Sequence, residues 1–240
     1  MKNQRIFEQA LVRATQILVQ QDQQASAVPY WKELENVAVF PENKRYALFN
    51  LMRWHYRSKA CESAQQKAEE VIELENLEVK VKWDAYEILA QSAMELGDTI
   101  KAEKAFMTLE SAPIDALAAE AHYFRAQQNY NNKEYEQSNE VIALLSQKFS
   151  SQPFWAAKSL LLMAKNFNAL NDAFQATYIL ESLITNYDQF PDIVMKGKSL
   201  LQQINEEQAK QNASLTQENL SSETLNYHYF WYCYCGAPFG

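Results

Sequence analysis

The sequence predicts an all-α fold: an α-solenoid of about five helical hairpins with a C-terminal capping helix. Only four glycines and six prolines occur in 240 residues, too few turn residues for a many-stranded sheet. Small residues also recur at a nearly constant interval, with successive spacings of 37, 38, 36 and 38, at Ala27, Ala64, Ala102, Ser138 and Ala176. A period of this length is typical of stacked helical hairpins.

A polar residue or glycine stands five positions before each of these small residues, at Asp22, Lys59, Gly97, Lys133 and Asn171. We interpret this polar residue or glycine as the end of the first helix of a hairpin, because such residues tolerate the turn conformation that ends a helix. The small residue then marks the point where the second helix crosses the first closely.

The fifth hairpin has the clearest pattern, because two apolar stripes at helical spacing flank the Asn171-Asp172 turn. Such a hairpin cannot bury both of its apolar faces alone and needs stacked neighbours. We expect a repeat domain over residues 1–211, with proline at 113, 153 and 191 between helical segments. Pro29 is expected in a first helical turn. The predicted hairpins span about residues 5–39, 44–76, 81–111, 114–149 and 153–188.

The capping helix is predicted over residues 191–211, with an apolar face of Ile193, Gly197, Leu200, Leu201 and Ile204. We expect residues 212–240, polar and then aromatic, to form a poorly ordered tail that the fold does not need. The alternative is that its aromatic residues pack against the hairpins. Three of its residues have metal-ligand chemistry, but three ligands in a short tail are a weak signal, so no metal or cofactor is predicted. They are His228, Cys233 and Cys235.

The net charge of −8 disfavours non-specific binding to nucleic acid or anionic membranes, which need a basic surface. No apolar run reaches the roughly 18 to 20 residues that span a bilayer, so we expect no membrane insertion. The beginning of the chain lacks the apolar core of a signal peptide. The chain as written suggests the cytoplasm, or the periplasm or envelope if it belongs to a longer exported protein.

The hairpins resemble tetratricopeptide repeats (TPRs) over about residues 5–190. The second hairpin, ALFNLMRWHYRSKACESAQQKAEEVIELEN, is similar to the repeat pattern without a gap, and the third has the Gly97-Asp98 turn of the family. The last two hairpins resemble the C-terminal repeats of bacterial cell-envelope TPR proteins. Pro29 departs from the pattern, and so does the fourth hairpin, where His122, Arg125 and Asn129 fall on the apolar stripe. A stripe of Tyr123, Ala126 and Tyr130 is the alternative register.

The resemblance implies a non-catalytic scaffold that holds a segment of a partner protein in a concave groove lined by first helices. Self-assembly through the groove or the tail is the alternative function. The basic groove residues Arg53, Arg57, Lys158 and Lys165 suit an acidic peptide or a C-terminal carboxylate. The two-Lys, two-Asn clamp of chaperone-binding TPR domains has no match in the chain. The implied groove residues are Phe49, Arg53, Tyr56, Arg57, Glu87, Gln91, Met94, Tyr123, Gln127, Tyr130, Lys158, Leu161 and Lys165.

The sequence gives no sign of an enzyme. The three histidines lie in separate segments, and no serine or cysteine sits in a recognisable nucleophile turn. Gly97 and Gly197 stand alone, whereas a phosphate-binding loop needs clustered glycines. Cys61 falls where the repeat has a buried aromatic residue, so we expect it to be a core thiol.

Overall fold

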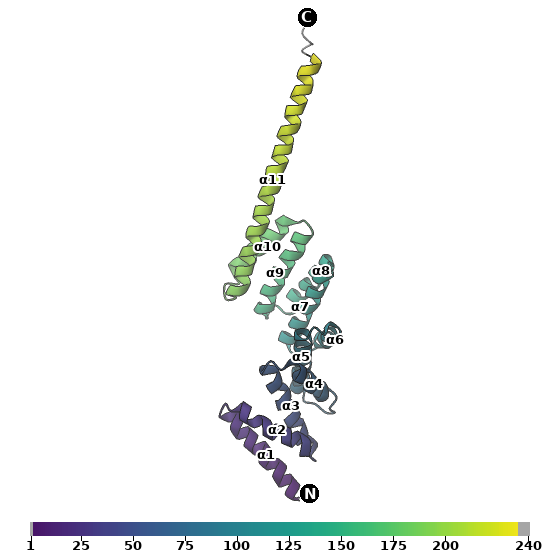
Figure 1. The fold of residues 1–240 in the computed structure, drawn as a ribbon, viewed down its shortest axis with the longest axis vertical. Coiled ribbons are helices and arrows are strands. Elements are labelled where there is room, and N and C mark those ends of the chain that lie inside the picture. The colour runs from purple at the N-terminus through teal and green to yellow at the C-terminus, as the bar shows by residue number, and fades with distance from the viewer. Residues whose placement is uncertain (1, 235–240) are drawn as a thin grey trace. The chain divides into compact units, whose positions relative to one another are not determined.

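The protein is all α, a sequential array of adjacent antiparallel helix pairs that ends in a long helix (Figure 1). The computed structural model describes the backbone of residues 2–234 and the side chains of residues 3–214. Within these limits it has eleven helices, α1 (Lys2–Gln20), α2 (Gln24–Val37), α3 (Pro41–Arg57), α4 (Cys61–Ile72), α5 (Val79–Glu95), α6 (Thr99–Leu109), α7 (Asp115–Asn131), α8 (Tyr135–Lys148), α9 (Pro153–Ala169), α10 (Ala173–Asn186) and α11 (Pro191–Tyr234).

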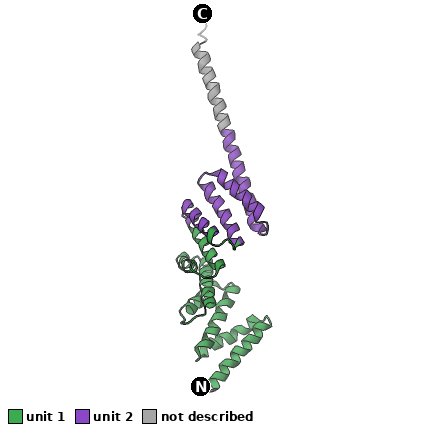
Figure 2. Cartoon of the chain, turned by 180° about the vertical axis from the view of Figure 1, so that it is seen from behind, with its two compact units in different colours: residues 1–128, 147–152 green, residues 129–146, 153–240 purple. Residues whose placement is uncertain are grey.

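The chain divides into two compact units (Figure 2). One comprises residues 1–128 and 147–152, and we call it unit 1. The other, unit 2, comprises residues 129–146 and 153–240. Unit 1 therefore holds the three pairs from α1 to α6 and most of α7. Unit 2 holds most of α8, the pair of α9 and α10, and α11.

All five predicted turn residues have a left-handed backbone, with φ between 59° and 74°. In each turn the following residue donates its amide N–H to a carbonyl five residues earlier, at N···O distances of 2.8 to 2.9 Å. The turn residue itself donates to the carbonyl three residues earlier. This pair of hydrogen bonds is the Schellman motif that ends a helix. The predicted turns are confirmed at Asp22, Lys59, Gly97, Lys133 and Asn171.

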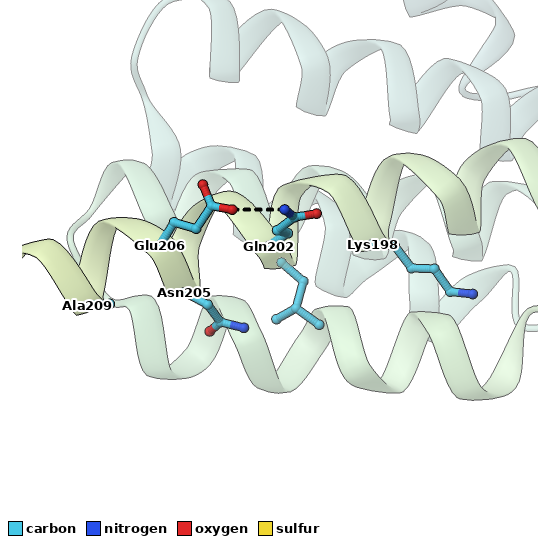
Figure 3. Close-up of a pocket in the computed structure, with 6 residues that line it drawn as sticks. Lys198, Gln202, Asn205, Glu206 and Ala209 are labelled. Carbon is cyan, nitrogen blue, oxygen red and sulfur yellow. Dashed lines mark hydrogen bonds between the residues drawn. The ribbon is translucent and has the colours of Figure 1, made fainter.

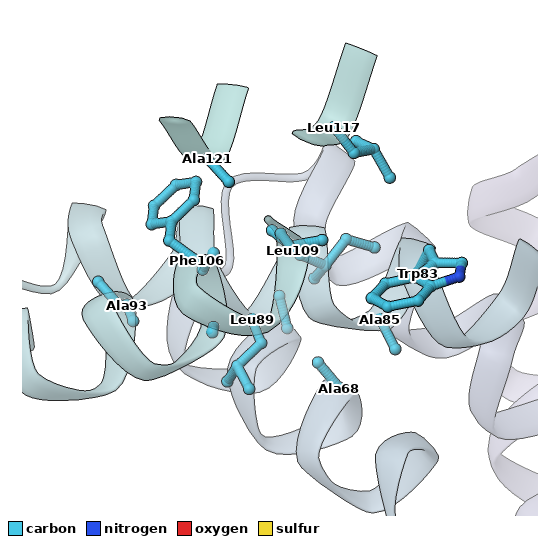
Figure 4. Close-up of a cluster of buried hydrophobic side chains, with 14 of the residues drawn as sticks. Ala68, Trp83, Ala85, Leu89, Ala93, Phe106, Leu109, Leu117 and Ala121 are labelled. Atoms are coloured by element: carbon cyan, nitrogen blue, oxygen red, sulfur yellow. The ribbon is translucent and has the colours of Figure 1, made fainter. Parts of the chain in front are cut away.

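The predicted small residues of the second helices are all buried. Each is at most 1 % exposed. In unit 1, Ala102 belongs to an apolar cluster that also includes Trp83, Leu89 and Leu109, which are labelled in Figure 4. Phe106 extends this cluster to α7, where its ring stacks on Phe124 with the centroids 4.0 Å apart.

The fourth hairpin keeps the predicted turn at Lys133, but its buried residues come from both predicted stripes. His122 lies on the buried stripe, only 5 % exposed, and its Nδ1 is 2.8 Å from the carbonyl oxygen of Ala118. Its ring contacts Phe149 edge-on, with the centroids 5.2 Å apart. Ala126 of the alternative stripe is also buried, at 0 % exposed. Arg125 and Asn129 of the first stripe are half-buried, as are Tyr123 and Tyr130 of the alternative stripe. A satisfied histidine therefore replaces the apolar residue that the repeat pattern expects.

Pro29 was expected in the first turn of a helix, but it lies inside α2, which begins at Gln24. The helix starts early because the Asp22 turn fixes its beginning, as the equivalent turn does in every other hairpin. Pro29 has no N–H to donate to the carbonyl of Ala25, so α2 lacks one internal hydrogen bond at this point.

A buried carboxylate connects α1 to the beginning of α3. Glu8 is 0 % exposed and accepts hydrogen bonds from Asn43 Nδ2 at 2.7 Å and from the Val39 amide at 2.8 Å. Burial alone raises the pKa of Glu8, but these bonds, with others from Gln4 and the Phe40 amide, hold the pKa below its usual value. The charged carboxylate thus fixes the position at which α3 starts.

The first part of α11 covers unit 2 as predicted. Ile193 and Ile204 are buried against α9 and α10, with Leu200 and Leu201 packed beside them. Gly197 lies at a close approach, because a Cβ built there would be 3.1 Å from Cδ2 of Leu183. The predicted end at Gln211 is wrong, since the helix continues to Tyr234. No glycine or proline occurs from residue 198 to 234 to stop it.

The backbone of residues 212–234 continues α11 as a helix. That the fold does not need this tail stays a prediction. The aromatic side chains of the tail, and His228, Cys233 and Cys235, lie outside the residues whose side chains are described.

The crossing sites yield a test of the repeat register. We expect Ala102→Leu and Ala176→Leu each to lower the free energy of unfolding by about 1 to 3 kcal/mol, because a larger side chain overfills a closed crossing. For a chain of this size that is a loss of roughly 2 to 4 °C in melting temperature per kcal/mol, measured by circular dichroism. The control is Glu103→Leu, at the exposed position next to Ala102. If both alanine variants melt like the wild type, the register is wrong.

Candidate partner-binding surface

Nine of the predicted groove residues lie on the first helices of unit 1. Arg57 and Met94 are exposed, Met94 by 47 %, and the others are half-buried. These side chains lie at equivalent positions of three successive first helices, α3, α5 and α7. The nine are Phe49, Arg53, Tyr56, Arg57, Glu87, Gln91, Met94, Tyr123 and Gln127, and we call them the first-helix surface.

Polar contacts connect each first helix of unit 1 to the next. Arg53 of α3 forms an ion pair with Asp84 of α5, and the Gln91 side-chain amide of α5 donates to Glu120 of α7. In both contacts the donor residue lies six positions before the turn residue of its own hairpin. The acceptor residue lies thirteen positions before the turn residue of the next hairpin. A third contact, between the hydroxyls of Thr15 and Tyr46 at 3.1 Å, joins α1 to α3.

Asp84 and Glu120 were not predicted as part of this surface. Their signal was present in the sequence, because Asp84 precedes Gly97 by the same thirteen residues by which Glu120 precedes Lys133. Comparing equivalent positions of consecutive hairpins would have found both. The surface is therefore more acidic than the sequence suggested.

Arg53 and Arg57 differ in how their charges are balanced. The Arg53 guanidinium binds Asp84 and lies over the Phe49 ring, with its central carbon 4.3 Å from the ring centroid. Arg57 is exposed and forms no ion pair with any residue of the described part of the chain. The positive charge available to a ligand thus comes mainly from Arg57, rather than from both residues equally.

Burial shifts the pKa of three ionisable groups on this surface. It raises the pKa of Glu87, which nearby Asp84 raises further and Arg53 lowers. Burial also raises the pKa of Tyr56, and Glu87 and Glu120 raise it further. Burial alone raises the pKa of Tyr123, whose hydroxyl donates to Gln127 Oε1 at 3.4 Å. Both tyrosines therefore keep hydroxyls that can donate hydrogen bonds at neutral pH.

The remaining four predicted residues lie in unit 2. Tyr130 packs against Tyr135, with ring centroids 5.6 Å apart, and the Lys158 ammonium lies 4.5 Å from the centroid of the Trp155 ring. Lys165 is exposed. Leu161 is only 8 % exposed because it packs in the core with residues of α10, so it does not belong to an accessible surface.

Unit 1 has two hollows beside the first-helix surface. A cavity of about 160 Å³ lies between α1, α2 and α3, and its lining includes Arg53 and Arg57. A second, of about 350 Å³, lies between α3, α4 and the beginning of α5, with Phe49 in its wall. Each opens beside side chains already assigned to the surface, so both extend what a partner could contact.

Unit 2 has a shallow hollow of about 450 Å³ along α11 (Figure 3). It is lined by Lys198, Leu201, Asn205 and Ala209, and by Gln202, whose amide donates to Glu206 at 2.8 Å. Its lining comes from one helix alone, which gives few converging polar groups to fix a ligand.

Residues 3–214 contain no group of three or more His, Cys, Asp or Glu side chains that could hold a metal ion. None of the helices searched in the described part of the chain is long and apolar enough to cross a membrane. Cys61 is half-buried at the beginning of α4, not in the core as predicted, and its thiol lies 3.7 Å from the Lys59 carbonyl oxygen.

The raised pKa of Glu87 predicts the effect of removing its charge. The folded state holds the proton more tightly than the unfolded state, so this group makes stability fall as the pH rises through and above 4.5. Glu87→Gln should therefore raise the free energy of unfolding at pH 7 and have little effect well below pH 4.5, measured by urea denaturation. A variant less stable than the wild type at pH 7 would contradict this assignment.

Comparison with known proteins does not identify a family or a function for this surface. No protein-family model matches the chain, and no curated protein matches it significantly. The fold itself is clear, a sequential array of antiparallel helix pairs. Function must therefore be inferred from the side chains on the first helices and from the hollows beside them.

Proposed function

We propose that this protein is a non-catalytic scaffold of the TPR type, which binds an extended or helical segment of a partner protein on its first-helix surface. The residues over about 5–190 resemble TPRs, and the last two hairpins resemble the C-terminal repeats of bacterial cell-envelope TPR proteins. No cofactor is needed for this function. The partner segment would contact α3, α5 and α7 in turn.

The observation that carries the proposal is the set of polar contacts between consecutive first helices. Arg53 with Asp84, and Gln91 with Glu120, hold charged and amide groups at a half-exposed surface. Arg53, Asp84 and Gln91 are half-buried, so these contacts lie between the core and the solvent. They fix the orientation of their side chains, which lowers the entropy that a partner must overcome on binding.

The composition of the surface also suits a protein interface. Aromatic residues, methionine and arginine are enriched at the centres of interfaces, and Phe49, Tyr56, Arg57, Met94 and Tyr123 supply all of these types. Met94 is 47 % exposed, so it is available for contact. A surface of exposed lysine and glutamate alone would not favour binding in this way.

Self-association is a second candidate, because one face of α1 exposes large apolar residues. Ile6, Phe7 and Ile17 are 57 %, 44 % and 42 % exposed. A second copy of the chain could cover such a face. Light scattering over a concentration series distinguishes this candidate from the first, since a scaffold that binds a different protein stays monomeric without its partner.

The proposal is tested by selecting peptides from a displayed library of random linear sequences against the full chain. We expect selected peptides to bind the wild type and to lose about tenfold or more in affinity for a variant combining Arg57→Glu and Met94→Glu, measured by fluorescence anisotropy. Both positions are exposed, so the variant should fold normally.

The matched control combines Lys104→Glu with Met107→Glu on the second helix α6, where both residues are also exposed. It likewise replaces one basic residue and one methionine with glutamate, away from the first helices. Equal loss of binding in both variants, or no loss in the first, would contradict the proposal.

A further inference from the structure

The cavity between α1, α2 and α3 combines aromatic walls with a basic rim. Its volume of about 160 Å³ is well below the roughly 300–1,000 Å³ of pockets that bury a whole small-molecule ligand. It has room for one side chain rather than for a helix or a cofactor. Trp31 and Trp54 form its aromatic walls, and Val19 adds an aliphatic surface that is 37 % exposed.

The two charged residues that line the cavity, Arg53 and Arg57, only donate hydrogen bonds. Arg57 is exposed and has no carboxylate partner among the described residues. Arg53 uses one nitrogen, Nη2, for Asp84, which leaves further N–H groups of its guanidinium. No aspartate or glutamate lines the cavity, although acidic residues outnumber basic ones in the chain by 30 to 22.

The two amides of the cavity are partly occupied. Asn50 Nδ2 donates to the Tyr46 carbonyl at 2.7 Å, and Gln24 Nε2 donates to Asp22 at 3.0 Å. Asp22 accepts this bond but does not itself line the cavity. The amides therefore add polarity to the rim, whereas the arginines determine its charge.

A further donor in the wall has no acceptor. Trp31 is only 2 % exposed, and its indole N–H has no hydrogen-bond partner in the described structure. A buried donor without an acceptor is costly, and most such groups in proteins are paired. An acceptor oxygen inside the cavity would lie next to this side chain.

We infer that this cavity binds the side-chain carboxylate of a glutamate or aspartate in the partner segment, with Arg57 supplying the charge and the tryptophan rings contacting the methylene groups. The inference rests on the proposed function, because the partner segment is the one that the first-helix surface would hold. A carboxylate carries one negative charge, which matches the single uncompensated arginine. A phosphate group carries about −1.5 to −2 and would need more positive charge than the rim provides.

The test follows the indole N–H signals of Trp31 and Trp54 in two-dimensional ¹H–¹⁵N spectra of the full chain, assigned with Trp31→Phe and Trp54→Phe. The probe is N-acetyl-glutamate N-methylamide, and its neutral match is the corresponding glutamine compound. We expect saturable shifts of both signals with the glutamate probe only, with a Kd on the order of 1 mM for a molecule of this size.

Arg57→Gln should weaken binding of the glutamate probe about tenfold or more, since it removes a charge-assisted hydrogen bond. Lys104→Gln, an exposed change on α6, should leave it unaltered. Equal shifts with the glutamine probe, or no shift at all, would overturn the inference. Tighter binding of N-acetylglycine or inorganic phosphate would overturn the assignment to a side-chain carboxylate.

The two proposals can fail separately. If displayed peptides bind the first-helix surface but the glutamate probe shifts neither indole signal, only the carboxylate site is wrong. If the probe binds and no displayed peptide depends on the first-helix surface, the scaffold proposal is wrong instead.

Discussion

The left-handed turn at the end of each first helix is the constraint on which the rest of the structure depends. Only one of the five turn residues is a glycine, and a left-handed backbone costs other residues about 1 to 2 kcal/mol. The two Schellman hydrogen bonds and the buried small residue five positions later offset that cost. Because the same turn recurs, each second helix begins two residues after its turn residue. In unit 1, the same pair of positions therefore brings Arg53 to Asp84 and Gln91 to Glu120.

Much of the fold could be predicted from the sequence, because small and turn residues repeat at fixed distances. The exceptions have local causes. Pro29 lies inside α2 because the Asp22 turn decides where that helix begins. The end of α11 could not be predicted from a polar composition alone, since a helix without glycine or proline has no defined stop.

The surface was harder to predict than the fold. Helical spacing identifies which residues share a face, but it does not say how deep each one lies, and Leu161 proved to be in the core. Contacts between hairpins depend on pairs of residues far apart in sequence, such as Arg53 and Asp84. These pairs changed the expected charge of the surface from basic to mixed, with Arg57 as its uncompensated cation.

The central claim is that the partner segment lies along the first helices α3, α5 and α7, rather than along the second helices. Site-specific photocrosslinking tests it most directly, with p-benzoylphenylalanine placed in the full chain at Gln91 on α5 or, separately, at Lys104 on α6, each mixed with a peptide selected by display. We expect a crosslinked peptide from the Gln91 position and none from the Lys104 position. Crosslinking at Lys104 in preference to Gln91 would contradict the claim.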